Sequence, residues 1–188
     1  MYKAVALIAL MALTVSIGCS QKLAVMEEPV EEVVVFETTQ GRIVIELYAD
    51  DAPLHVENYR KLVTNGYYAG EARTFHRYVD GFVIQGGDPW GRESRAGQGG
   101  PGYTVPAEIG RDHLLGSVAA ARTGDASNPK RASSGSQFYI CLDALPNLDG
   151  DYSVFGQVIE GIDAVMKLRQ GDEITEASLV LRSEAVQD

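Results

Sequence analysis

The sequence predicts a mainly β domain, a closed, antiparallel, eight-stranded barrel capped by two helices. Short runs rich in β-branched and aromatic residues recur along the chain, as strands of antiparallel folds do. Only two helix-like segments occur, far apart in the sequence, so the strand–helix alternation of a parallel sheet is missing. The chain has 188 residues, of which 45% are hydrophobic. It is therefore large enough to form one core without disulfides or a structural metal.

The first elements form a hairpin followed by a helix. Val33–Thr38 is β-branched, and Arg42–Tyr48 alternates apolar and polar residues, so both are expected to be strands. The turn Thr39–Gly41 between them predicts that they pair. Asp50–Pro53 then opens a helix, with acids ahead of its first turn and proline at a tolerated position. Asn65–Gly66 ends this helix, because both residues accept the left-handed conformation.

The rest of the domain is expected to be mostly strands and loops. Phe75–Val79 and Phe82–Gln85 flank Asp80-Gly81, and a Gly-rich loop occupies Gly86–Gly102. Gly161–Leu168 is the second helix, with an apolar face. Four further strands are expected at Ser117–Ala121, Gln137–Leu142, Ser153–Val158 and Ala177–Leu181.

The hairpin around Asp80-Gly81 decides where Arg77 points. A two-residue loop would place Arg77 opposite Ile84, on the face away from Val83 and Gln85. A three-residue loop of Val79–Gly81, with Gly81 left-handed, would instead place Arg77 across from Val83. The second arrangement, which we favour, brings a cation, an amide and an apolar side chain onto one surface.

The first residues predict a bacterial lipoprotein signal peptide. Lys3 precedes a mostly apolar stretch, Ala4–Ile17, which is shorter than the roughly 20 residues that a spanning helix needs. The small residue Gly18 then precedes Cys19, as in the lipoprotein signals that this segment resembles, whose cysteine becomes lipidated. A simple cleaved signal and a retained anchor helix are the alternatives.

These features divide the chain into a signal peptide (1–18), a flexible tether (19–32), one folded domain (33–182) and a polar tail (183–188). The tether is rich in acids and contains Pro29, as expected of a segment that holds a domain away from a surface. On this interpretation the protein is exported. Its lipid on Cys19 anchors it to a membrane of the cell envelope, on the periplasmic face.

Composition and motifs argue against several other functions. The net charge of −10 and the lack of a Lys/Arg run oppose binding to nucleic acid. His55, His76 and His113 have no zinc-ligand spacing, so neither a metal nor a cofactor is expected. The sequence contains no G-x-S-x-G motif of a serine hydrolase. Cys141, in an apolar run, is expected to be a small buried residue.

Glycines 97, 99 and 102 have the G-x-G-x-x-G spacing of a dinucleotide-binding loop. The residues that follow, Tyr103–Pro106, cannot open the helix whose N-terminus such a loop requires. A nucleotide site is therefore not expected here.

Several blocks, taken together and in order, resemble those of the cyclophilins, a family of peptidyl-prolyl cis/trans isomerases. The resemblance extends over residues 33–181. The blocks are Phe75-His76-Arg77, Gly81-Phe82, Gln85-Gly86-Gly87-Asp88, Gly135-Ser136-Gln137-Phe138-Tyr139-Ile140, Leu148-Asp149-Gly150 and Val154-Phe155-Gly156.

The resemblance implies a role for each matching position. Arg77 matches the catalytic arginine, and Gln85 is assigned to the catalytic set beside it. The expected proline pocket consists of Phe82, Val83, Tyr139, Leu148 and Tyr152, although core packing is the alternative role for its apolar members. The residues expected to hold the rest of the peptide are Gly97, Ala121, Arg122 and Gln137.

This chain departs from the commoner family pattern at several positions. Val83 stands where methionine is frequent, and Tyr139 replaces phenylalanine. Asn147 and Tyr152 replace the tryptophan and histidine of the best-known eukaryotic members. The segment Thr123–Ser134 is longer than in the short members, and it is expected to affect substrate preference.

Rotation about an X-Pro bond needs no nucleophile, base or metal, because no covalent bond breaks. The barrier of about 18–20 kcal/mol comes from amide resonance, so the site must prefer the twisted amide over both planar forms. The expected partners are proline-containing polypeptides, in particular exported proteins that are folding, and the protein is expected to act as a monomer. The alternative is a chaperone module that binds prolyl segments without catalysis.

Overall fold

The computed structural model describes residues 31–186. The expected signal peptide, the expected lipidation site Cys19 and nearly all of the expected tether lie outside the described residues. Within them, no helix is both long enough and apolar enough to span a membrane.

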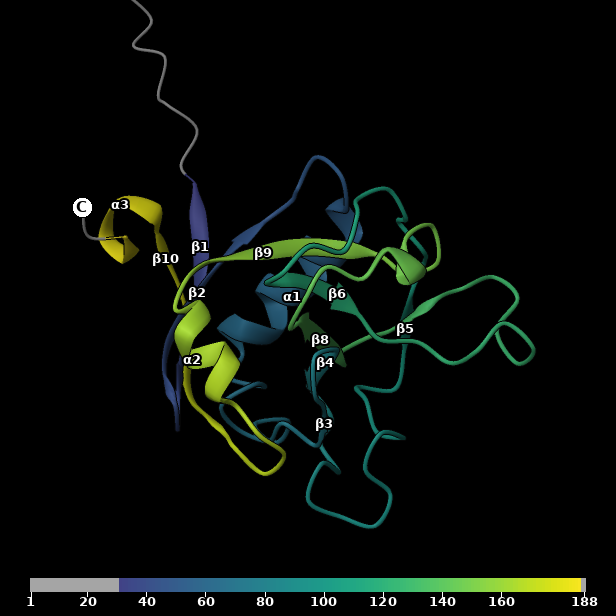
Figure 1. The fold of residues 1–188 in the computed structure, drawn as a ribbon, viewed down its shortest axis with the longest axis horizontal. Helices are drawn as coiled ribbons and strands as arrows, with labels where there is room; N and C mark the ends of the chain where they lie inside the picture. Colours follow the sequence, from purple (N-terminus) through teal and green to yellow (C-terminus); the bar gives the residue numbers. More distant parts are fainter. Residues whose placement is uncertain (1–30, 187–188) are drawn as a thin grey trace, which may run out of the picture.

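The fold is built on one antiparallel sheet of eight strands that curls around a core (Figure 1). Its two edge strands, β10 and β3, do not pair with each other. A single bridge between Thr74 and Glu173 connects the segments that precede them. The prediction of a closed barrel is therefore corrected to an open, curled sheet. In spatial order the strands are β10 (Ile174–Leu181), β1 (Glu32–Thr38), β2 (Gly41–Leu47), β9 (Val154–Glu160), β6 (Ser117–Ala120), β8 (Phe138–Cys141), β4 (Val83–Gly86) and β3 (Arg77–Val79).

The expected first hairpin is present, since β1 pairs with β2 and Thr38 lies opposite Gly41. The hairpin of β3 and β4 has a different register from the expected one. Arg77 pairs with Gln85 and Val79 with Val83, so the loop is Asp80–Phe82 and the register moves by two residues. A shift of two residues leaves every side chain on the same face. Gly81 has the expected left-handed conformation, with φ +61°.

Helix α1 (Pro53–Thr64) packs its buried face against the main core. Tyr59 lies at the centre of an aromatic cluster. Its ring centroid is 4.8 Å from those of Tyr68 and Phe155, and 5.7 Å from that of Phe138. These rings belong to the same buried cluster as the inward-facing apolar residues of β1, β2, β8 and β9. The helix ends before Gly66, which is left-handed at φ +71°, as expected.

The free backbone N–H groups at the N-terminus of α1 donate to a carboxylate that is distant in the sequence, and not to the acids that directly precede the helix. Its N-cap residue makes no side-chain capping bond. The carboxylate of Glu108 instead accepts the backbone N–H groups of Leu54 and His55, at 2.9 and 3.0 Å. An anion at this end of a helix also offsets the helix dipole. The long segment that follows the Gly-rich loop is thereby held against α1.

The smaller elements have too few residues to show periodicity. They are β5 (Thr104–Val105), which pairs with β7 (Ser133–Ser134), the single turn η1 (Pro146–Leu148) and α3 (Arg182–Ala185), whereas α2 (Ile162–Lys167) is the expected second helix. Helix α3 overlaps the expected polar tail, and its Ala185 is buried in a cluster with Val33 and Val35 of β1. Cys141 is buried, as expected.

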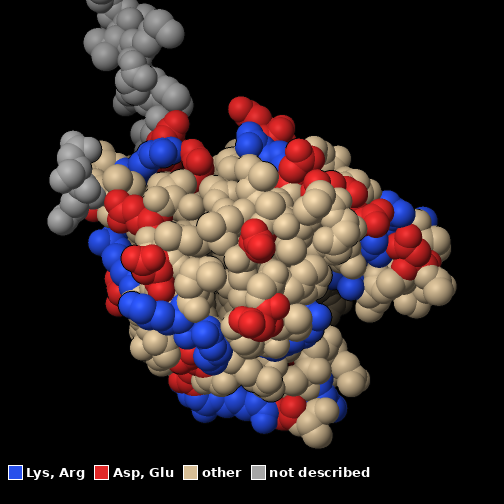
Figure 2. All heavy atoms as spheres, in the orientation of Figure 1, with Lys and Arg blue, Asp and Glu red and all other residues tan. Residues whose placement is uncertain are grey.

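Charged side chains of both signs alternate around the edge of the face shown in Figure 2, whereas its centre is mostly uncharged. On this face, therefore, the net negative charge is distributed and forms no single acidic patch. In Figure 1 the segment between β6 and β7 extends away from the sheet beyond the β5 label, whereas the Gly-rich segment after β4 loops out below β3.

Candidate active site

Nine of the eleven residues expected at the site line one hollow of about 270 Å³. We call it the smaller hollow. It lies over the face of β4 and β8 that is turned away from the main core. The hairpin register places Arg77, Val83 and Gln85 on this same face. Its lining consists of Arg77, Phe82, Val83, Gln85, Ala121, Arg122, Tyr139, Leu148 and Tyr152.

The floor of the smaller hollow is a second apolar cluster, separate from the main core. Val83 and Tyr139 are 2% and 5% exposed, whereas Phe82 and Leu148 are half-buried at the rim. The two roles considered for these residues therefore coexist. Val83 and Tyr139 pack in a core, and their upper surfaces form a cavity wall that Phe82 and Leu148 extend toward solvent.

A chain of hydrogen bonds connects the exposed guanidinium of Arg77 to the interior. Its Nη1 donates to Oε1 of Gln85 at 3.2 Å. Nε2 of Gln85 donates to Oε1 of Gln137 at 2.9 Å, and Nε2 of Gln137 donates to the carbonyl of Gly99 at 2.8 Å. Each amide thus has a fixed orientation. The chain holds Arg77 over the hollow although the residue itself is exposed.

The Gly-rich loop is organised by Asp88, which is fully buried. Its carboxylate accepts the backbone N–H groups of Trp90, Gly97 and Gly99. Gly99 has no room for a side chain, because a Cβ there would lie 2.0 Å from Asp88 Oδ1. Sequence reasoning quoted Asp88 only as part of a matching block and missed its role. An acid among several glycines was the available signal.

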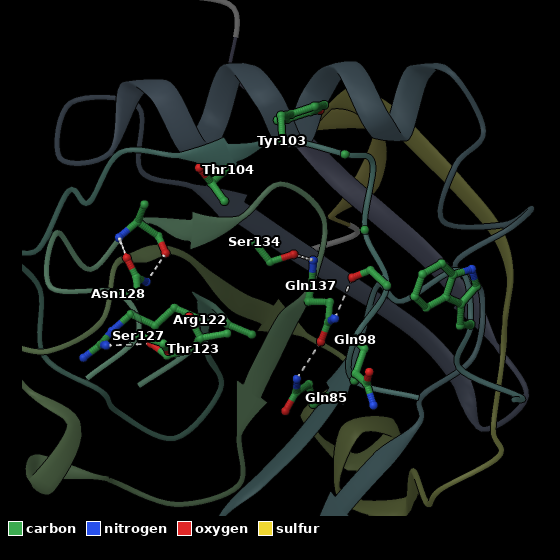
Figure 3. A pocket seen from close by; sticks show the side chains of 17 residues that line it. Gln85, Gln98, Tyr103, Thr104, Arg122, Thr123, Ser127, Asn128, Ser134 and Gln137 are labelled. Carbon is green, nitrogen blue, oxygen red and sulfur yellow. Dashed lines mark hydrogen bonds between the residues drawn. The ribbon is translucent and has the colours of Figure 1, made fainter. Parts of the chain in front are cut away.

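A larger hollow of about 780 Å³ adjoins the smaller one and shares Gln85, Ala121 and Arg122 with it. The two expected residues outside the smaller hollow, Gly97 and Gln137, line this one. Figure 3 shows Gln137 between Ser134 above it and Gln85 below it. Arg122 and Asn128 lie to the left of these three residues. Sequence reasoning did not single out its other lining residues, among them Gln98, Tyr103, Thr104, Ser127 and Asn128.

The wall between the two hollows is Arg122, whose side chain is only 5% exposed. Its guanidinium lies 4.5 Å above the Tyr152 ring. It donates to the carbonyl of Asp151 at 2.9 Å and to Oδ1 of Asp125 at 2.6 Å. Asp125 belongs to the long segment between β6 and β7, so that segment sets the position of this wall.

The electrostatics of the site favour donation to an incoming carbonyl or amide. Arg77 and Arg122 are the charged residues that line the two hollows, and no carboxylate lines either of them among residues 31–186. Within the same residues Arg77 makes no ion pair with Asp or Glu, in contrast to Arg122. The Arg77 guanidinium therefore keeps donors free for a ligand. No group of three or more His, Cys, Asp or Glu gathers in this part of the chain.

Comparisons with known proteins identify the class of this fold and site. The sequence model described as "Cyclophilin type peptidyl-prolyl cis-trans isomerase/CLD" matches residues 33–183. A peptidyl-prolyl cis-trans isomerase of Synechococcus elongatus is 41% identical over 149 residues, which cover 78% of this chain and 94% of the relative. Peptidyl-prolyl cis-trans isomerase B of Bacillus subtilis is 38% identical over 139 residues, 72% of this chain and 89% of the relative.

The chain therefore belongs to the cyclophilin-type peptidyl-prolyl cis/trans isomerase family, and isomerisation of X-Pro bonds is its function. A crystal structure of a cyclophilin-type isomerase from Cryptosporidium parvum matches with a TM-score of 0.69 and 28% identity, over 80% of this chain and 97% of that one. A second structure of that protein, in the presence of the dipeptide Ala-Pro, matches with a TM-score of 0.67.

Proposed function

We propose that Arg77 and Gln85 carry the isomerisation and that the smaller hollow holds the proline ring. The observation that supports this most directly is the position of a guanidinium that forms no ion pair among residues 31–186, at the edge of a hollow with an apolar floor. Arg77, Phe82, Val83 and Tyr139 share that hollow. The Cryptosporidium parvum protein was crystallised in the presence of Ala-Pro, which supports a prolyl ligand for a site of this class.

Twisting the X-Pro amide removes its resonance and localises a lone pair on the proline nitrogen. The Arg77 guanidinium can donate to that nitrogen or to the substrate carbonyl oxygen, whereas planar amides offer no such nitrogen lone pair. An interaction that strengthens on twisting lowers the barrier, and uniform binding does not. Gln85 holds the guanidinium through the 3.2 Å hydrogen bond. No proton is transferred, so no group need titrate.

Arg77 cannot supply the whole acceleration. A charge-assisted hydrogen bond contributes about 1.5–3 kcal/mol, whereas a millionfold acceleration requires about 8 kcal/mol. The remainder is assigned to holding both sides of the bond and to removing water from it. Phe82, Leu148 and Tyr152 surround the ring, and Gln137, Ala121 and Arg122 are placed to bind the peptide that leads away from it.

A purified-protein assay separates catalysis from simple binding. A proline-containing peptide is followed through its cis-to-trans relaxation with and without the protein. Catalysis predicts faster relaxation at substoichiometric protein. If the peptide binds but its relaxation rate stays unchanged, the non-catalytic chaperone module replaces the present proposal.

We also propose that the substrates are exported proteins and that the protein works from a lipid anchor on Cys19, at the periplasmic face of an envelope membrane. The supports are the apolar stretch ahead of Cys19 and the acidic tether after it. Intact-mass measurement of the protein from membranes tests the anchor, since the proposal predicts an N-terminus at Cys19 carrying fatty acyl groups. A mature chain without added lipid mass would refute it.

A further inference from the structure

A buried histidine lies directly behind the smaller hollow. The His113 side chain is fully buried. Its Nδ1 is 2.9 Å from Oδ1 of Asp149, and its Nε2 is 3.0 Å from the hydroxyl oxygen of Tyr139. Asp149 also accepts the backbone N–H of His113, at 2.8 Å. Tyr139 forms the floor of the hollow, and Asp149 directly follows the rim residue Leu148.

The directions of these hydrogen bonds follow from the chemistry of the three groups. An ionised carboxylate can only accept hydrogen bonds, so Nδ1 of His113 carries a hydrogen and donates a hydrogen bond to Asp149. In the neutral ring Nε2 is then an acceptor, and the Tyr139 hydroxyl donates to it. The two bonds from His113 lower the pKa of Asp149, which keeps the acceptor ionised. Burial raises the pKa of Tyr139, so its hydroxyl keeps the donated proton.

His113 also contacts the wall of the hollow through its ring and its backbone. Its ring lies nearly parallel to that of Tyr139, with centroids 6.1 Å apart, and nearly perpendicular to that of Tyr152, at 6.3 Å. Its carbonyl accepts the N–H of Leu145, whose own carbonyl accepts the N–H of Leu148. One residue thus contacts the floor and is connected to both sides of the rim.

We infer that His113 is a positioning residue: it fixes the relative positions of Tyr139, Leu148 and Tyr152, so that they form a pocket the size of a proline ring. This inference rests on the proposed function of the smaller hollow. His113 engages the Tyr139 hydroxyl behind the pocket, so the tyrosine presents its ring to the ligand and its oxygen remains paired. A buried hydroxyl without a partner would instead be costly. The tyrosine at this position is thereby accommodated without making the pocket polar.

Two variants test the inference, one at His113 itself and one at its carboxylate partner Asp149. His113→Asn can keep the contact with Asp149 but is too short to reach Tyr139. Asp149→Ala removes the acceptor that holds the ring, at a side chain that is 28% exposed and therefore better tolerated by the fold. The matched control is His55→Asn. His55 is also buried and also pairs with a carboxylate, Glu108, at 2.6 Å, but it lies outside the smaller hollow.

The readout is the separation of KM from kcat for a prolyl peptide. The pocket holds the ring in every state of the reaction, so a pocket that is loosened but still excludes water from the bond should raise KM with little effect on kcat. We expect KM to rise about fivefold in both variants, the equivalent of about one hydrogen bond, with kcat within twofold. His55→Asn should leave KM unchanged.

A purely structural role predicts a different pattern, because a smaller folded fraction lowers the apparent kcat and leaves KM unchanged. That pattern, or an equal rise of KM in His55→Asn, would overturn the inference. If His113→Asn does not fold, the Asp149→Ala result decides alone. If the wild-type chain is inactive, the proposed catalysis fails. The dissociation constant of the same peptide then tests the pocket, and equal affinity for wild type and Asp149→Ala would overturn the inference.

Discussion

Replacing Arg77 by alanine is the most direct test of how the site works. The side chain is exposed, and its hydrogen bond to Gln85 is 3.2 Å long. Among residues 31–186 it forms no ion pair with a carboxylate, so its removal leaves no buried partner charge unpaired. Exposed substitutions of this kind change stability by about 0.5 kcal/mol or less. The fold should therefore survive the change.

The expected loss of activity follows from the strength of one bond. A charge-assisted hydrogen bond is worth about 1.5–3 kcal/mol, and each 1.36 kcal/mol changes the rate about tenfold. Arg77→Ala should thus lower kcat/KM by about 10- to 150-fold. The effect should lie mainly in kcat, because the contact to the proline nitrogen forms only as the amide twists. Arg77→Lys keeps the charge but loses the forked geometry of the guanidinium. Its kcat/KM should therefore lie between those of wild type and Arg77→Ala.

The assay is the cis-to-trans relaxation of a proline peptide, with unfolding measured on the same samples. Arg111→Ala is the matched control. It removes the same charge from another exposed arginine, which lies over Tyr48, outside both hollows. That control should keep its activity. An Arg77→Ala protein that is folded and as active as wild type would refute the mechanism, and so would an equal loss in Arg111→Ala.

Three further outcomes follow from the structure. Gly87→Ala should destabilise the fold by about 3 kcal/mol in urea unfolding, because φ is +82° and a Cβ would lie 2.1 Å from the Ser136 carbonyl oxygen. Gln137→Leu breaks the amide chain and should lower kcat/KM about tenfold, and it should also lower the free energy of unfolding by about 1–3 kcal/mol, because the buried Gly99 carbonyl loses its donor. Burial lowers the pKa of both His55 and His76, so the unfolded chain gains these protons at a higher pH than the folded chain does as the pH falls through about 6.5. The free energy of unfolding should thus decrease from pH 7.5 to 5.5, and decrease less in His55→Asn.

Local patterns predicted most of the sheet and the face on which Arg77 lies. Alternation in Arg42–Tyr48 and the turn before it predicted a hairpin that is present. The register of β3 and β4 was wrong by two residues, yet the face was right, because faces repeat every second residue. Closure of the barrel was wrong for a different reason. Whether β10 meets β3 depends on the total curl of eight strands, which no single segment encodes.

The contacts that were missed connect residues far apart in the sequence. Glu108 caps a helix that begins more than fifty residues earlier, and no local signal marks it as a cap. Asp88 accepts hydrogen bonds from three backbone N–H groups of the Gly-rich loop, and the loop's conformation depends on these bonds. Sequence spacing excludes His113 as a zinc ligand but reveals no other role, because its partners Tyr139 and Asp149 belong to two separate sequence blocks. Such roles follow from tertiary geometry alone.

The long segment between β6 and β7 connects the surroundings of the two hollows. Arg131 is the non-glycine residue with positive φ among residues 31–186, at 55°, a conformation that costs about 1–2 kcal/mol. Its guanidinium offsets this cost by bonding the Gly150 carbonyl at 2.9 Å, Asp151 at 2.7 Å and Asp125 at 3.0 Å. The wall of the larger hollow is thereby joined to the turn that bears the rim of the smaller one.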